Sequence, residues 1–121
     1  MGEIATSNRQ ITLFYNSNSV RANKALAFAK AEGLALQTID ILKTPLTGTQ
    51  IVELANRLGL EVHDLVNQEH SSYMSKFEPH ELSSEDWIKM IQHNPEIMKQ
   101  PIALKGDKTV LVETPSDILK I

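Results

Sequence analysis

The sequence contains no cysteine among its 121 residues. Disulfide bonds, a thiolate nucleophile and the cysteine ligands of a zinc site are therefore excluded. The four histidines offer no substitute, because no two of them stand four residues apart, as paired ligands on one helix face do. We therefore expect no metal site.

Long hydrophobic runs are also missing. No stretch approaches the roughly 20 apolar residues of a membrane helix, and residues 1–10 lack the apolar core of a signal peptide. An excess of positive charge is missing too, since the formal net charge is −3 and the pI is near 5.8. These absences predict a cytoplasmic protein that contacts neither a membrane nor, directly, nucleic acid.

The length and composition are those of one globular domain. A hydrophobic fraction of 41% and a charged fraction of 22% are ordinary values for a folded chain. Residues 1–10 are polar and unpatterned, and we interpret them as a mobile N-terminal segment. Residues 11–121 are expected to form the single domain.

Residues 11–33 have the pattern of a strand, a polar loop and a helix. Ile11 to Tyr15 are apolar or favour strands, and the alanine-rich residues 25–32 favour a helix. The four residues between, 16–19, are asparagines and serines, which cap helix starts. A helix start at the carboxyl end of a strand attracts anions through its free amides and its dipole.

The rest of the chain alternates strand and helix signals. They predict a strand at residues 34–41 and a helix begun by a capping box at Thr47 and Gln50. Short helical patterns follow after Glu61, and a helix is expected from Ser83 to Asn94. Two strands at 101–105 and 109–112 around a turn, and a last helix at Thr114 and Pro115, complete the chain. This order is that of an α/β thioredoxin-like fold. It has a four-stranded mixed sheet with helices on both faces and a helical insertion between strands 2 and 3.

Four segments of the sequence resemble the ArsC/Spx family, which comprises glutaredoxin-coupled arsenate reductases and the Spx regulators. The segments are TLFYNSNSVRANKALAFAKAEG, VNQEHSSYMSKF, WIKMIQHNPEIMKQPIAL and ETPSDIL. The first is similar to the family pattern N-P-x-C-x-x-S/C-R, in which Asn16 matches the asparagine and Ser19 stands at the cysteine. The resemblance covers nearly all of the chain from Ile11 onward.

The resemblance also shows what this chain has replaced. In the family's arsenate reductases a cysteine attacks arsenate and three arginines hold the oxyanion. The matching residues here are Ser19, Asn67, Gln100 and Thr114. A serine oxygen cannot form a mixed disulfide with glutathione, and neutral side chains lose the charge-assisted contacts to the anion. We therefore predict a degenerate site without classical arsenate reduction, while other enzymatic activity stays open.

Two interpretations of the Ser19 region stay open. Ser19 is an N-cap and nothing more, or its hydroxyl binds an anion or the thiolate of glutathione. The candidate ligand-binding residues are Asn16, Ser19, Val20, Arg21 and Pro101. The resemblance places Pro101 where thioredoxin-like folds have a cis proline, and we expect a cis bond there.

Two classes of function follow. The first is a non-catalytic protein-binding or regulatory module, a pseudoenzyme. The Spx regulators supply the precedent, because they bind RNA polymerase through the carboxyl-terminal domain of its α chain. The second is an enzyme or sensor that binds glutathione or a small oxyanion at Ser19. No cofactor is required by the first, and glutathione is the candidate for the second.

Overall fold

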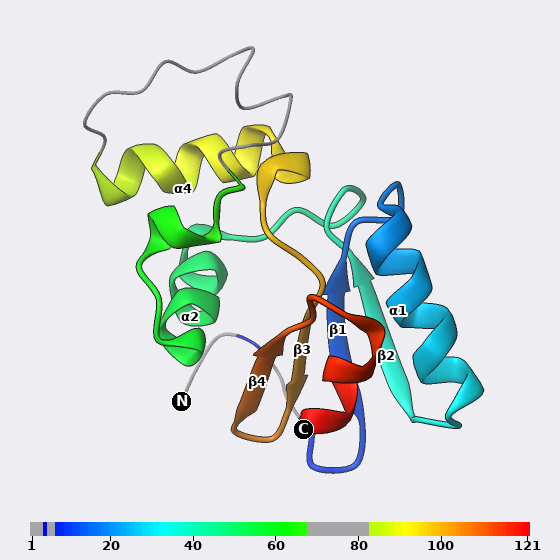
Figure 1. Ribbon diagram of the computed structural model, residues 1–121. Helices are drawn as coiled ribbons and strands as arrows, with labels where there is room; N and C mark the ends of the chain where they lie inside the picture. Colours follow the sequence, from blue (N-terminus) through cyan, green and yellow to red (C-terminus); the bar gives the residue numbers. More distant parts are fainter. Residues whose placement is uncertain (1–3, 5–6, 68–82) are drawn as a thin grey trace.

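The computed structural model describes residue 4 and residues 7–67 and 83–121 (Figure 1). The part of the family resemblance that falls on residues 68–77, and the histidines His70 and His80, lie outside the described residues. The fold below is therefore that of the described parts of the chain.

The centre of the fold is a four-stranded mixed sheet. Its strands are β1 (Ile11–Tyr15), β2 (Leu36–Asp40), β3 (Ile102–Lys105) and β4 (Lys108–Leu111), in the order β2-β1-β3-β4. β1 pairs with β2 in parallel and with β3 antiparallel, and β3 pairs antiparallel with β4. The predicted mixed sheet is therefore confirmed.

One face of the sheet is covered by α1 (Val20–Ala31) and by η3 (Pro115–Lys120). Alternate strand residues point to opposite faces, so Leu13 of β1 packs under α1. The inner face of α1 consists of small residues, and Ala22, Ala25 and Ala29 are fully buried. Because alanine is so short, α1 can lie close to the strands.

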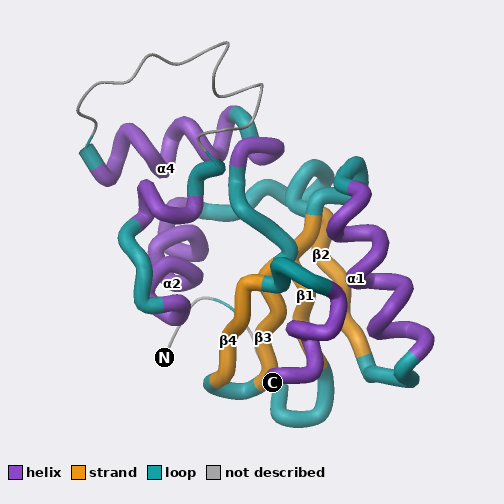
Figure 2. Tube along the Cα trace, viewed as in Figure 1, coloured by secondary structure: helices purple, strands orange, loops and turns teal. Residues whose placement is uncertain are grey.

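The other face is covered by the insertion between β2 and β3. Its described helices are α2 (Gly48–Leu58), η1 (Val62–Leu65), α4 (Ser84–His93) and η2 (Pro95–Ile97) (Figure 2). Phe14 of β1 and Ile102 of β3 pack against this layer. The predicted arrangement, with helices on both faces and an insertion after strand 2, is confirmed.

The helix boundaries follow the capping signals of the sequence. At α2, the Thr47 hydroxyl accepts from the Gln50 amide, and the Gln50 side chain accepts from the Thr47 amide. Ser83 and Asp86 form the same reciprocal pair at α4. Gly33 ends α1 with a φ of 73°, a left-handed conformation in which a side chain would be strained.

Four details differ from the sequence-based expectation. The second strand is shorter than residues 34–41, β3 begins at Ile102 and not at residue 101, and β4 runs from Lys108 to Leu111 and not over residues 109–112. The last helix is a 3₁₀ helix, in which the Asp117 amide donates to the Thr114 carbonyl, three residues earlier. Six residues allow hardly two turns, and short helices commonly adopt this tighter form.

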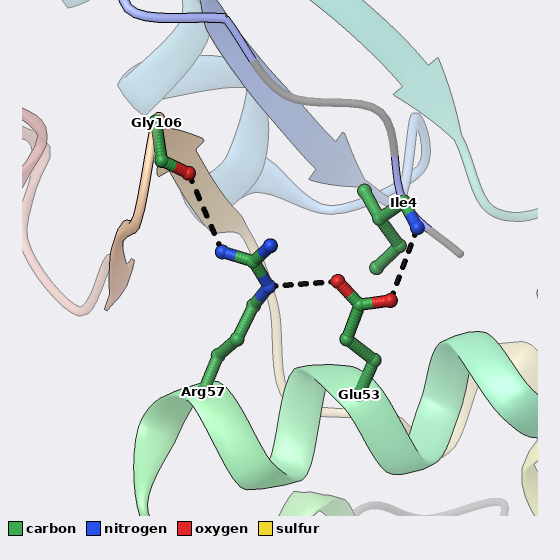
Figure 3. A network of polar contacts seen from close by, with 4 residues as sticks. All are labelled: Ile4, Glu53, Arg57 and Gly106. Carbon is green, nitrogen blue, oxygen red and sulfur yellow. Dashed lines mark hydrogen bonds and ion pairs between the residues drawn. The ribbon is translucent and has the colours of Figure 1, made fainter. Parts of the chain in front are cut away.

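Two described residues near the N-terminus contact other elements: Ile4 bonds to Glu53 of α2 (Figure 3), and the Ser7 carbonyl accepts from the Gly106 amide in the turn between β3 and β4. Ile4 is buried in the core, and its amide donates to Glu53 Oε1 at 3.0 Å. The other oxygen of Glu53 pairs with Arg57 Nε at 2.8 Å, and Arg57 donates to the Gly106 carbonyl at 3.4 Å. We call Ile4, Glu53, Arg57 and Gly106 the N-terminal clamp.

No helix in the described part of the chain combines the length and the apolar character needed to cross a membrane.

Candidate functional site

The loop between β1 and α1 places Ser19 at the start of the helix. Ser19 has an extended backbone, with φ −88° and ψ 126°, and its hydroxyl oxygen accepts from the Ala22 amide at 3.2 Å. Ser19 is thus the N-cap of α1, a role that is compatible with both interpretations of the sequence.

Asn16 and Gln100 hold this loop from inside. Asn16 is 7% exposed, and its side-chain oxygen accepts from the Asn18 amide at 2.8 Å. The Asn16 amide donates to the side-chain oxygen of Gln100 at 3.0 Å. Gln100 precedes Pro101, and the bond between them is cis, which confirms the prediction. Gln100, which the resemblance places at a family arginine, therefore has a structural role here.

Asp40, at the end of β2, ties the same loop to the sheet. Its Oδ1 accepts from the amides of Ser17 at 3.3 Å and Leu42 at 3.1 Å. Burial raises the pKa of Asp40, but the hydrogen bonds from Ser17 and Leu42 and the charge of Lys43 outweigh it, so that the pKa lies below its ordinary value. Asp40 is therefore ionised at neutral pH and keeps accepting both amides.

A short backbone pairing brings Asn67 to the loop. The Asn67 amide donates to the Ile97 carbonyl at 2.7 Å, and the Lys99 amide donates to the Leu65 carbonyl at 2.6 Å. Between these bonds, Val66 and Met98 form an isolated antiparallel bridge. Segments that lie far apart in sequence thereby become neighbours at the carboxyl end of β1.

These segments enclose a cavity of about 630 Å³, which we call the main cavity. Its lining is mostly polar and comprises Asn16, Asn18, Ser19, Arg21, Leu42, Asn67, Glu96, Met98, Lys99 and Gln100. Arg21 and Lys99 bring positive charge to the wall, and Glu96 brings negative charge. The cavity has the size of the sites in which proteins bind small organic molecules.

The structure brings most of the predicted site residues together. Asn16, Ser19, Arg21, Asn67 and Gln100 all line the main cavity. Thr114 does not. It lines a neighbouring hollow of about 300 Å³ together with Val20, Arg21, Lys24, Glu113 and Pro115. Pro101 is buried and lines neither.

Sequence reasoning missed five residues of the main cavity: Asn18, Leu42, Glu96, Met98 and Lys99. Lys99 matters most, because it places a positive charge at the cavity, and matching this sequence to the family arginines did not reveal that charge. The only signal in the sequence was its place directly before Gln100.

Three features of this site bear on what it can bind. The chain has no thiol, and the described residues contain no group of three or more metal-ligating side chains. Among those residues, no acceptor lies at the backbone amides of Val20 and Arg21, at the start of α1. These amides and the two cations can attract a negatively charged group.

Solved structures show the same fold. The structure of an arsenate reductase from Vibrio cholerae superimposes with a TM-score of 0.83, at 20% identity, over 95% of this chain and 99% of the other. An arsenate reductase (ArsC) related protein from Brucella melitensis gives a TM-score of 0.69, at 13% identity, over 97% and 100% of the two chains.

The sheet order and the capped helix at the carboxyl end of β1, together with these likenesses, define a thioredoxin-like α/β protein. A sequence model of the ArsC family matches residues 14–121, and the chain belongs to the ArsC family. It is also 24% identical over 115 residues to the uncharacterized protein YfgD of Escherichia coli strain K12, a match that spans 93% of this chain and 97% of YfgD.

Proposed function

We propose that this protein is a non-catalytic member of the ArsC family that acts by binding another protein. The chain has the family's fold but no thiol with which to form a mixed disulfide. A serine hydroxyl is not ionised at neutral pH without a strong base. Protein binding requires neither group.

The observation that carries this proposal is the use of the catalytic positions as structural ones. The Ser19 hydroxyl caps α1, and the Gln100 side chain accepts from the Asn16 amide. Two positions that are reactive or anion-binding in the family's reductases therefore stabilise the loop. At the start of α1, directly after this loop, Val20 is 69% exposed, and Arg21 beside it is exposed too.

Protein interfaces commonly place an apolar side chain among polar and cationic neighbours. Val20 is the most exposed of the large hydrophobic residues in the described chain, and it lies where α1, the loop and η3 meet. This is the surface on which we expect the partner to bind.

Site-specific photo-cross-linking in cells tests the proposal. A photoreactive amino acid in place of Val20 should yield a cross-linked species of higher mass after irradiation. The matched control carries the same amino acid in place of Lys30, which is exposed near the other end of α1. Cross-linking at position 20 but not at position 30 supports a specific partner, and equal cross-linking at both or none at either contradicts it.

A second candidate function is binding of a small anion or of glutathione in the main cavity. Arg21 stands in the first turn of α1, and that turn contains no acidic residue. A cation near a helix start is unfavourable by about 0.3–1 kcal/mol, because it meets the positive end of the dipole. A bound anion would offset this repulsion and accept from the free amides of Val20 and Arg21.

Titration with inorganic phosphate and with glutathione, followed by NMR of the labelled chain, tests the second candidate. Saturable shifts at Ser19, Val20 and Arg21 are expected, with weaker binding in Ser19→Ala and Arg21→Gln. Lys30→Gln is the control for loss of one positive charge on α1. An absence of shifts at millimolar ligand excludes this candidate and leaves protein binding unaffected.

A further inference from the structure

Arg21 lines three hollows. It belongs to the main cavity, to the hollow of about 300 Å³ beside Thr114, and to a third hollow of about 290 Å³. The third shares Asn67 and Lys99 with the main cavity and Glu113 with the Thr114 hollow. The three hollows are thus neighbours with common walls, and we call them together the Arg21 groove.

The dimensions of the Arg21 groove suit an extended ligand. The main cavity of about 630 Å³ lies within the range of about 300–1,000 Å³ that is typical for organic ligands. A single tetrahedral oxyanion would leave most of that volume, and both neighbouring hollows, to water. A peptide segment can occupy the hollows in succession, because its side chains project at regular intervals.

The charge of the groove is opposite to that of the whole chain. Among the described residues that line it, the cations are Arg21, Lys24 and Lys99, and the anions are Glu96 and Glu113. The groove is therefore net positive on a protein whose formal net charge is −3. An acidic partner is repelled by the protein as a whole and attracted here, which directs it to this surface.

One end of the groove is apolar. Val20, which is 69% exposed, and Pro115 line the hollow beside Thr114, and most of the accessible wall there is apolar. An apolar side chain of the ligand would cover Val20, and burial of apolar surface is favourable by about 25 cal/mol per Å². The two ends of the groove thus favour different side chains.

We propose that the Arg21 groove binds an extended acidic peptide segment of a partner protein. One carboxylate of the segment lies between Arg21 and Lys99, and an apolar side chain near it in the segment covers Val20 and Pro115. This inference rests on the proposed protein-binding function and specifies the class of partner. It involves no covalent step.

Peptide selection with the full chain tests the inference. A phage-displayed library of random heptapeptides is selected on the purified protein, and a selected peptide is labelled with fluorescein. We expect the selected sequences to combine aspartate or glutamate with a nearby leucine, isoleucine, valine or phenylalanine. Fluorescence anisotropy then measures the affinity. It should fall as salt rises from about 50 mM to about 500 mM, because salt screens the charges.

Three variants locate the binding. Arg21→Gln and Lys99→Gln should each weaken binding by about tenfold, the effect of losing one charge-assisted contact. Val20→Asp should weaken it at least as much, since it removes the apolar contact and repels the carboxylate. Lys30→Gln, the matched control on the same helix, should leave the affinity unchanged.

Selected peptides without acidic residues would overturn the inference, and so would binding that Arg21→Gln leaves intact. A library that yields no binder also overturns it. Cross-linking at position 20 distinguishes this failure from failure of the proposed function. If it still captures a partner, the protein-binding function stands and only the acidic segment is wrong.

Discussion

At the scale of single residues, Ser19, which the resemblance places at the family cysteine, is part of the scaffold. The Ser19 hydroxyl accepts from the Ala22 amide, and the adjoining loop is held by Asn16 and Gln100. The N-cap could be predicted from the sequence, because capping depends on residues within one turn of the helix. The bond to Gln100 could not, since it spans 84 positions.

The contribution of Ser19 to stability can be measured. Ser19→Ala removes the acceptor for the Ala22 amide and should lower the free energy of unfolding by about 0.5–2 kcal/mol, the usual effect of losing an N-cap. Urea unfolding followed by circular dichroism gives the value. Ser116→Ala, at an exposed serine of η3, should change it by less than half as much. Equal effects of the two changes would refute the capping role.

Asp117 makes stability depend on acid pH. Its carboxylate accepts from the Thr114 amide and pairs with Lys120 Nζ at 2.9 Å, and these contacts lower the pKa of Asp117 from 3.8 to about 2. The folded state thus holds the ionised form more strongly than the unfolded state does. The resulting stabilisation is complete above the ordinary pKa and is lost as the pH falls from about 4 to about 2.

Asp117→Asn should therefore flatten the pH dependence of the unfolding free energy between about pH 4 and about pH 2. Urea midpoints measured at several pH values in this interval give the slope. Asp107→Asn, at an exposed aspartate of the turn between β3 and β4, is the control and should retain the original slope. A slope unchanged in Asp117→Asn would show that other carboxylates determine it.

At the scale of elements, helix and strand types follow from local pattern, whereas the contacts between elements do not. The predicted capping box at Thr47 and the predicted helix start at Ser83 are both confirmed by the structure. The N-terminal clamp has no such signal. Glu53 and Arg57 form an ordinary i, i+4 pair on a helix, and only the folded chain shows that they also bond to Ile4 and Gly106.

The N-terminal clamp can be tested by hydrogen exchange. Glu53→Ala removes the acceptor of the Ile4 amide, which should then exchange about tenfold faster because a charge-assisted hydrogen bond is lost. Glu53→Gln keeps a side-chain oxygen at this place and should retain most of the protection. NMR-detected exchange of the Ile4 amide gives both rates. Equal exchange rates in Glu53→Ala and Glu53→Gln would indicate that the side-chain carboxamide introduced by Glu53→Gln does not bond to the Ile4 amide.

At the scale of the whole molecule, the chain has the ArsC-family fold and no thiol. Arg21 and Lys99 contribute positive charge to the main cavity. The resemblance places Asn67, Gln100 and Thr114 at the family arginines, and Thr114 lies outside the main cavity. The cations that line the main cavity, Arg21 and Lys99, are at other positions than these three.

We expect no arsenate reduction by the chain, because it has no thiol, and none by Ser19→Cys. The cysteine would stand at the helix start, but Asn67 and Gln100 are neutral and would not hold the oxyanion as arginines do. An assay with glutathione and glutaredoxin that follows NADPH consumption measures turnover, and an active ArsC-family reductase in the same assay is the positive control. Turnover by Ser19→Cys would show that the matching of these positions is wrong.

The order of the amino acids was enough to infer which segments are strands and which are helices, where a helix is capped, the family, and the loss of thiol chemistry. They depend on the identity of single residues and on hydrogen bonds within a few positions of one another. Only the folded chain shows that one cavity is lined by Arg21, Asn67 and Lys99 and that Thr114 lies outside it. The sheet order and the pairing of residues 65–67 with 97–99 bring distant segments together, and no local pattern encodes which surfaces then meet.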